Sequence, residues 1–235
     1  MQTKRMIRIF NDRYPLVGPV VWMFSIQYFI IQLISALAWN SPFSLLQNTI
    51  SDLGNTVCGT YSGRFVCSPL HATMNLSFIT FGITMALGSL LIYQEFRKNV
   101  GSLVGFSAMA VAGLGTIMVG LFPENTIGAL HVLGASGPFL IGNFGMVILG
   151  IYLPLPKSLR IYTLVLGGIA LIALGFFYSK HYVGLGIGGM ERIVAYPQTL
   201  WLISFGIYMS RSHYKSLKAG RIKGYHSKHA RRSNG

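Results

Sequence analysis

Long, nearly uninterrupted runs of apolar residues dominate the chain and predict helices that cross a membrane. About 20 apolar residues in a helix span a hydrocarbon core about 30 Å thick. None of the runs alternates with the two-residue period of a barrel strand, so we expect helices rather than strands. Polar positions separate six such segments: Pro15–Trp39, Pro69–Tyr93, Gly101–Phe122, His131–Leu153, Ile161–Tyr178 and Ile193–Met209.

The last segment carries the weakest signal. Pro197 and Gln198 interrupt it, and Glu191 and Arg192 stand just before it. We still count it as a span, because the even number agrees with the distribution of basic residues described next. The predicted fold is therefore an all-α integral membrane bundle of six transmembrane helices.

Basic residues gather on one side of this predicted bundle. Sixteen of the 19 Lys and Arg residues fall in the N-terminus, in the second and fourth connections and in the C-terminal tail, while the other side holds only Arg64, Lys180 and Arg192. By the positive-inside rule both termini are cytoplasmic. We expect three regions: a basic cytoplasmic N-terminus at 1–14, a six-helix transmembrane domain at 15–210 and a basic cytoplasmic tail at 211–235.

Composition supports a membrane protein and limits the interpretation of the charge. The 235 residues are 52% hydrophobic and only 10% charged, against about 25% charged in a soluble domain. This excludes an ordinary soluble enzyme, a disordered chain and a disulfide scaffold. A net charge of +14 suggests nucleic acid, but the chain has almost no solvated face to present it. We expect a multi-pass protein of the cell membrane, without a nucleic-acid partner, whose basic tail binds anionic inner-leaflet lipids.

Short similarities between the outer loops suggest an internal repeat. The stretch 47–50 reads Gln-Asn-Thr-Ile and the stretch 124–127 reads Glu-Asn-Thr-Ile. His71 and His131, each preceded by Leu, open the second and fourth segments and lie 60 residues apart. The six helices are then three repeated helical hairpins, the third being divergent. The alternative is chance similarity between membrane segments of low complexity.

The two cysteines of the chain, Cys58 and Cys67, both fall in the first outer loop. An oxidising outer compartment permits a disulfide between them, and this pairing is our expectation. The alternative is two free thiols at the end of a helix.

The predicted outer side concentrates carboxylates and imidazoles. Three of the five acids, Asp52, Glu124 and Glu191, lie there, and histidines stand at the outer ends of helices. Ionisable groups near hydrocarbon normally face the protein interior or a water-filled cavity. We therefore expect one extracytoplasmic polar site. The candidate catalytic residues are Asp52, His71, Glu124 and His131, and the candidate binding residues are Asn48, Ser51, Asn75, Asn125, Glu191 and Arg192.

Several chemistries fit these residues. Carboxylates and neutral imidazoles suit a divalent metal such as zinc, with His71 and His131 as ligands. They also suit acid–base work on a lipid or lipid-linked head group, which the site would bind or hydrolyse. Three alternatives stay open: a structural role as helix caps and loop bonds, a small-molecule transporter or channel, and a non-catalytic membrane scaffold. A transporter would use the polar residues within the segments: Gln27, Gln32, Asn75 and Asn143.

The outer-side motifs resemble a known family. The box Asn48–Gly54, the Cys67–Pro69 entry to the second helix, the stretch Gly120–Glu124 and His131 are similar to an uncharacterised prokaryotic family catalogued as domain of unknown function 998. The resemblance covers roughly residues 15–210. It implies a compact, multi-spanning helical membrane protein with its signature residues on the outer side. No established activity comes with it.

Overall fold

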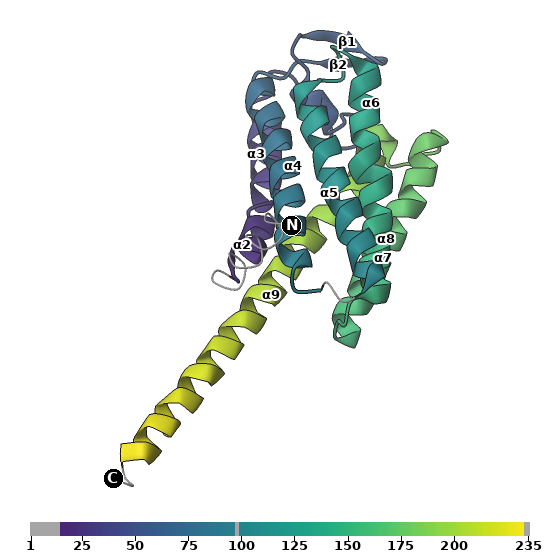
Figure 1. The fold of residues 1–235 in the computed structure, drawn as a ribbon. Coiled ribbons are helices and arrows are strands. Elements are labelled where there is room, and N and C mark those ends of the chain that lie inside the picture. The colour runs from purple at the N-terminus through teal and green to yellow at the C-terminus, as the bar shows by residue number, and fades with distance from the viewer. Residues whose placement is uncertain (1–14, 97–98, 233–235) are drawn as a thin grey trace.

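The computed structural model describes residues 15–96 and 99–232, with side chains up to Lys215. The predictions for 1–14 and for the basic side chains beyond Lys215 fall outside the described residues and side chains. The described chain is a bundle of helices with a short β-hairpin over one end (Figure 1). The helical elements are α2 (Val17–Met23), α3 (Ile26–Leu37), η1 (Ser51–Gly54), α4 (His71–Tyr93), α5 (Val100–Leu121), α6 (Gly128–Ser136), η2 (Gly137–Gly142), α7 (Asn143–Tyr152), α8 (Lys157–Tyr178) and α9 (Gly186–Arg232).

Five helical stretches are long and apolar enough to cross a membrane, and they match the first five predicted segments. The fourth stretch comprises α6, η2 and α7. Its π-helical turn η2 has Pro138 near its start, where the missing N–H of proline interrupts the regular bonding of an α-helix. The stretches indicate a multi-pass membrane protein: Val17–Leu37, His71–Tyr93, Val100–Leu121, Gly128–Tyr152 and Lys157–Tyr178.

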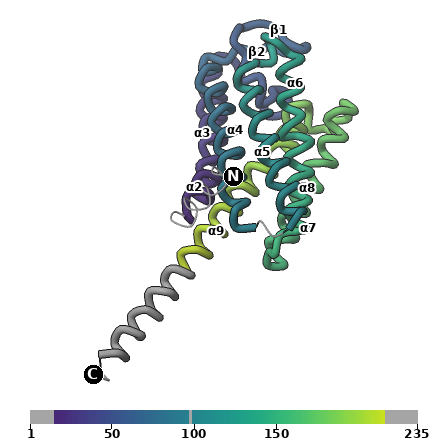
Figure 2. Tube along the Cα trace, in the orientation of Figure 1, coloured from purple at the N-terminus to yellow at the C-terminus, as the bar shows by residue number. Residues whose placement is uncertain are grey.

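The sixth predicted segment lies within α9, which is a single helix of 47 residues. This helix is not among the five apolar stretches. The polar residues noted in the sequence lower its mean hydropathy. Three of them, Glu191, Arg192 and Gln198, are buried in the protein. The helix packs against α8 and α2, which lie on opposite sides of the bundle, and it runs obliquely between them (Figure 2).

The centre of the bundle is an aromatic cluster that joins distant segments. Trp22 of α2 and Trp201 and Phe205 of α9 are completely buried. The ring centroid of Trp22 lies 5.3 Å from that of Trp201 and 5.6 Å from that of Phe205. The indole N–H of Trp22 donates to the carbonyl of Met85 in α4 at 3.2 Å. These contacts fasten α9 to the first span.

Helix α5 packs against its neighbours through small residues. A Cβ atom on Gly113 would lie 2.5 Å from the carbonyl oxygen of Gly82 and 2.7 Å from the backbone nitrogen of Ala86, both in α4. Glycines at such contacts let the backbones of two membrane helices approach closely. The tight α4–α5 pair holds together the ends of both helices that lie next to the β-hairpin (Figure 1).

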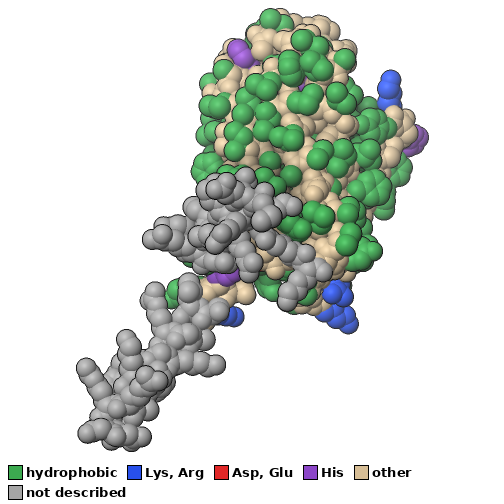
Figure 3. Space-filling model, in the orientation of Figure 1, with side chains coloured by type: hydrophobic (Ala, Val, Ile, Leu, Met, Phe, Trp, Pro, Cys, Tyr) green, Lys and Arg blue, Asp and Glu red, His purple; other side chains and the backbone are tan. Residues whose placement is uncertain are grey.

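The outward faces of the helices are apolar. Leu33, Leu114 and Ile172 are 62%, 58% and 65% exposed. Hydrophobic side chains cover the face shown in Figure 3, where no acidic side chain is visible. Apolar surface of this extent is unusual on a soluble monomer and is expected where lipid takes the place of water.

A short β-hairpin in the loop between α3 and α4 accompanies the all-α bundle that the sequence predicts. Strands β1 (Gly59–Tyr61) and β2 (Arg64–Val66) pair antiparallel, and they are too short to leave a periodic signal in the sequence. Ser62 and Gly63 form the turn with φ angles of 48° and 79°, as a two-residue hairpin turn with both central φ angles positive requires. The predicted disulfide is confirmed, because Cys58 and Cys67 are bonded across the base of the hairpin.

Candidate functional site

The hairpin delivers Arg64 to the buried carboxylate of Asp52. The Nε of Arg64 donates to Oδ2 at 2.6 Å and its Nη2 donates to Oδ1 at 2.7 Å. The Asp52 side chain is completely buried. It also accepts the backbone N–H of Thr49 at 2.9 Å and the amide of Asn48 at 3.3 Å. Two-pronged pairing of this kind fixes the orientation of both groups.

Glu124 is the second carboxylate near Arg64 and is held differently. Its Oε1 lies 3.8 Å from Nη2 of Arg64, while its backbone carbonyl accepts the hydroxyl of Tyr61 at 2.9 Å. Burial, followed by the nearby Asp52 carboxyl, raises the pKa of Glu124 to about 9. Burial also acts to raise the pKa of Asp52, but hydrogen bonds from Arg64 and Glu124 outweigh it, so that this pKa lies below its ordinary value. At neutral pH Glu124 is therefore protonated beside an ionised Asp52–Arg64 pair.

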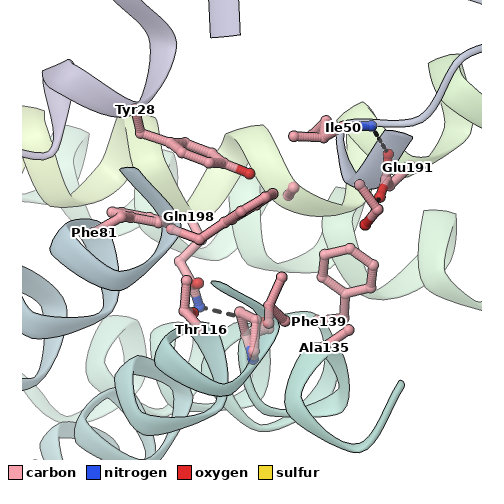
Figure 4. Close-up of a pocket in the computed structure, with 13 residues that line it drawn as sticks. Tyr28, Ile50, Phe81, Thr116, Ala135, Phe139, Glu191 and Gln198 are labelled. Carbon is pink, nitrogen blue, oxygen red and sulfur yellow. Dashed lines mark hydrogen bonds between the residues drawn. The ribbon is translucent and has the colours of Figure 1, made fainter. Parts of the chain in front are cut away.

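His131 forms a second arrangement with Ser51. Its Nε2 lies 3.0 Å from the Ser51 hydroxyl oxygen, and its Nδ1 lies 2.9 Å from the carbonyl oxygen of Phe122. The Ser51 hydroxyl also reaches Oε1 of Glu191 at 3.2 Å. The other oxygen of Glu191 accepts the backbone N–H of Ile50, which is the dashed bond drawn between these two residues in Figure 4. Three candidates from distant elements thus meet in one chain of hydrogen bonds.

A pocket of about 210 Å³ brings the two arrangements together. Val132 and Tyr178, which line it, are 59% and 56% exposed on the outer surface of the bundle. Its lining residues are partly polar and partly apolar, so the pocket is amphipathic, and we call the two sets the polar wall and the apolar wall. The polar wall includes Ser51, Arg64, Glu124, His131 and Glu191, and the apolar wall includes Val132, Ala135, Phe139, Phe177 and Tyr178.

A small inner cavity of about 30 Å³ adjoins the pocket. Ser51, Ala135, Phe139 and Glu191 line both spaces. Figure 4 shows the inner cavity between Tyr28 and Phe81 on one side and Phe139 on the other. Its size suits one or two water molecules rather than an organic group.

Other candidates hold the loops in place. Arg192 directs Nη1 to the carbonyl oxygens of Leu45, Asn48 and Gly188 at 3.0, 2.7 and 2.8 Å. The buried guanidinium of α9 thereby fixes the loop that carries Ser51. Asn125 exchanges two hydrogen bonds with Thr56, at 3.1 and 3.0 Å, and so joins the α3–α4 loop to the α5–α6 loop.

His71 is not among the residues that line the pocket, and its hydrogen bond is local. Its Nδ1 is 3.0 Å from the carbonyl oxygen of Ser68, three residues earlier, whereas His131 reaches back nine residues to Phe122. Asn75 donates to the carbonyl of Gly54 at 2.8 Å. The two histidines of the predicted repeat thus make different contacts, and the repeat stays a prediction. In the described part of the chain, no three His, Cys, Asp or Glu side chains form a group suited to a metal ion.

The polar residues within the helices also form hydrogen bonds between helices. Gln27 and Ser77 pair at 2.8 Å, and Tyr196 donates to Gln32 at 2.9 Å. Asn143 donates to the carbonyls of Phe139 and Val194. These bonds join neighbouring helices in pairs.

Sequence reasoning missed Arg64 as a member of the site. We used this residue only to orient the bundle, although it is the single cation of the loop that carries both cysteines. Its position between Asp52 and Glu124 along the chain was the available signal. Tyr61, which lines the pocket and is bonded to the Glu124 backbone, gave no comparable signal.

Comparison with known proteins agrees with the resemblance inferred from the motifs. The family model described as "Protein of unknown function (DUF998)" matches residues 20–208. The match includes the five apolar stretches almost entirely and every residue of the polar wall. No curated protein and no solved structure matches the chain.

Proposed function

Because the chain belongs to the DUF998 family, whose description assigns no activity, we propose its function from the pocket: it binds the polar head of a membrane lipid or lipid-linked molecule. The observation that carries this proposal is the amphipathic lining. Arg64, Glu124 and His131 form a polar wall, and Val132 and Tyr178 continue the apolar outer surface of α6 and α8. A molecule with a polar head and an apolar body satisfies both walls at once.

The pocket is proposed to lie at the extracytoplasmic leaflet. Disulfides persist in oxidising compartments, and the Cys58–Cys67 bond lies in the hairpin beside the pocket. The opposite end of the bundle carries Lys157 and Arg160 at the start of α8. In this orientation both termini are cytoplasmic, α9 is the sixth span, and the basic tail meets anionic inner-leaflet lipids.

The polar wall favours a head group that accepts hydrogen bonds. Asp52 already neutralises the charge of Arg64 through the two-pronged pair. Glu124, with its pKa raised to about 9 by burial and by Asp52, is a neutral carboxyl group and adds no negative charge that would repel an oxygen acceptor. The guanidinium of Arg64 has five N–H groups, more than its bonds to Asp52 and Thr49 use, and can donate to such an acceptor. Phosphate, ester and sugar oxygens are acceptors of this kind.

A pocket-filling variant tests the proposal. Val132→Trp adds an indole at the exposed apolar wall of the pocket, where it should displace the bound molecule without disturbing the core. Val165→Trp is the matched control, because Val165 is 50% exposed on α8 and is not among the residues that line the pocket. The full chain is purified in mild detergent, and co-purifying lipids are extracted and quantified by mass spectrometry.

We expect a specific lipid to co-purify with the unaltered protein and with Val165→Trp, and to be strongly depleted from Val132→Trp. Equal lipid content in all three samples would contradict a pocket-bound lipid, because bulk annular lipid does not respond to one indole in the pocket.

A further inference from the structure

Ser51 and His131 have the geometry of a nucleophile and its general base. We propose that Ser51 attacks the acyl ester of a membrane lipid and that His131 accepts the hydroxyl proton. The inference rests on the proposed lipid-binding function and names its substrate class and reaction. Its foundation is the 3.0 Å distance between the Ser51 hydroxyl oxygen and Nε2 of His131, which is within the range for proton transfer to a general base.

The second nitrogen of His131 fixes the direction of the proton transfer. Nδ1 lies 2.9 Å from the carbonyl oxygen of Phe122. A carbonyl oxygen only accepts hydrogen bonds, so Nδ1 must carry the proton of the neutral ring. Nε2 then has a free lone pair, and it faces Ser51. The Phe122 carbonyl thus sets the tautomer, a task that a carboxylate performs in many serine hydrolases.

The surroundings hold Ser51 in place. Ser51 is the first residue of η1, and the next residue, Asp52, is clamped by Arg64. Glu191 accepts both the backbone N–H of Ile50 and the Ser51 hydroxyl. In the resting protein the hydroxyl proton is therefore shared between Glu191 and His131. Glu191 is a positioning residue, because its hydrogen bonds reach His131 only through Ser51.

The shape of the site selects a lipid ester. The inner cavity of about 30 Å³ cannot accept an acyl chain, so the chain must lie along the apolar wall formed by Val132, Phe177 and Tyr178. That wall faces outward, where the bilayer supplies acyl chains. The ester linkage of a lipid lies between its chains and its head, and Ser51 lines the same pocket as the residues of both walls.

The reaction balances without any group other than water. The Ser51 oxygen bonds to the ester carbonyl carbon while its proton passes to Nε2 of His131. The carbon–oxygen bond to the lipid alcohol then breaks, and that alcohol takes the proton from Nε2. The acyl group stays on Ser51 until water, which gives a proton to Nε2 of His131, attacks the acyl carbon. The bond between that carbon and the Ser51 oxygen then breaks, the Ser51 oxygen takes the proton back from Nε2, and a fatty acid is released. Arg64 lines the same pocket and is the cation available to the developing oxyanion.

A fluorophosphonate probe tests the inference, since it phosphonylates serine hydroxyls activated by a base. The full chain in lipid nanodiscs is treated with the probe, and the adduct is mapped by mass spectrometry. We expect the adduct on Ser51 of the unaltered protein and none in Ser51→Ala. His131→Gln should react at least about 100-fold more slowly, the usual contribution of a general base. The control is Ser179→Ala, an exposed serine at the end of α8, which should react normally.

Co-purifying lipid is measured on the same samples to separate the two proposals. An adduct on Ser51 of the unaltered protein supports the inference whether or not a variant folds well. An unmodified Ser51 in protein that retains its lipid overturns the inference and leaves lipid binding intact. Unchanged reactivity in His131→Gln also overturns it. The absence of both adduct and bound lipid contradicts the two proposals together.

Discussion

Two carboxylates share a single guanidinium at the hairpin end of the bundle, and only one of them is compensated. Asp52 takes both prongs of Arg64 and two further donors, while Glu124 stands 3.8 Å from the same cation. A second buried negative charge would remain unpaired there, and such a charge costs several kcal/mol. Keeping a proton on Glu124 avoids that cost, so the residue is a neutral hydrogen-bonding group at neutral pH.

The raised pKa of Glu124 predicts a pH-dependent stability. Its pKa is about 9 in the folded protein against an ordinary value of 4.5, so the folded state holds a proton that the unfolded chain releases. This contribution is fully present below about pH 4.5 and is lost as the pH rises toward 9, by up to about 1.4 kcal/mol per pH unit. Glu124→Gln mimics the protonated acid and should flatten the dependence. Thermal unfolding in one detergent between about pH 5 and 9 measures this; parallel curves for both proteins would contradict it.

The residues of the site differ in how far sequence could reveal them. Ser51, Glu124 and His131 were predictable as outer-side polar groups, because few such groups exist in an apolar chain. The role of Arg64 depends on the turn at Ser62–Gly63 and on the disulfide, which together fold the hairpin back onto Asp52. Hydropathy contains no information on that pairing, and the site remained incomplete without it.

At the level of helices, the glycines of α5 make a prediction of their own. A Cβ on Gly113 would lie 2.5 Å from the Gly82 carbonyl oxygen, so Gly113→Ala must push α4 and α5 apart. We expect a loss of about 1–3 kcal/mol, typical of an overpacked contact. Gly168→Ala in α8 is the control, since nothing lies within 4 Å of its added Cβ. That change should be neutral or stabilising, because alanine favours a helix. Thermal unfolding of the two variants gives the comparison, and equal melting temperatures would contradict close α4–α5 packing as a source of stability.

The helices show what hydropathy can and cannot predict. The first five segments were found within a few residues of their ends, because long apolar runs have few alternatives in a membrane. Helix α9 is a harder case, since Glu191, Arg192 and Gln198 form hydrogen bonds with protein partners that no local sequence window contains. Its buried polar face identifies α9 as part of the site as well as of the bundle.

For the whole molecule, the proposed orientation places the hairpin outside and the start of α8 and the C-terminal part of α9 in the cytoplasm, and single cysteines test it. In a Cys58→Ser/Cys67→Ser background, Thr60→Cys marks the hairpin, Ser158→Cys the start of α8 and Ser212→Cys the helix beyond the last buried residues of α9; all three positions are exposed. We expect a membrane-impermeant maleimide to label Thr60→Cys on intact cells and the other two only after lysis. Ser158→Cys is the internal control for the positive-inside orientation.

Labelling of Ser212→Cys on intact cells, with Ser158→Cys still protected, would mean that α9 returns to the outer side and that five spans, not six, cross the membrane. Labelling of Ser158→Cys but not of Thr60→Cys on intact cells would mean that the bundle has the opposite orientation. The pocket and its disulfide would then lie in the reducing cytoplasm, where the disulfide is not expected to persist.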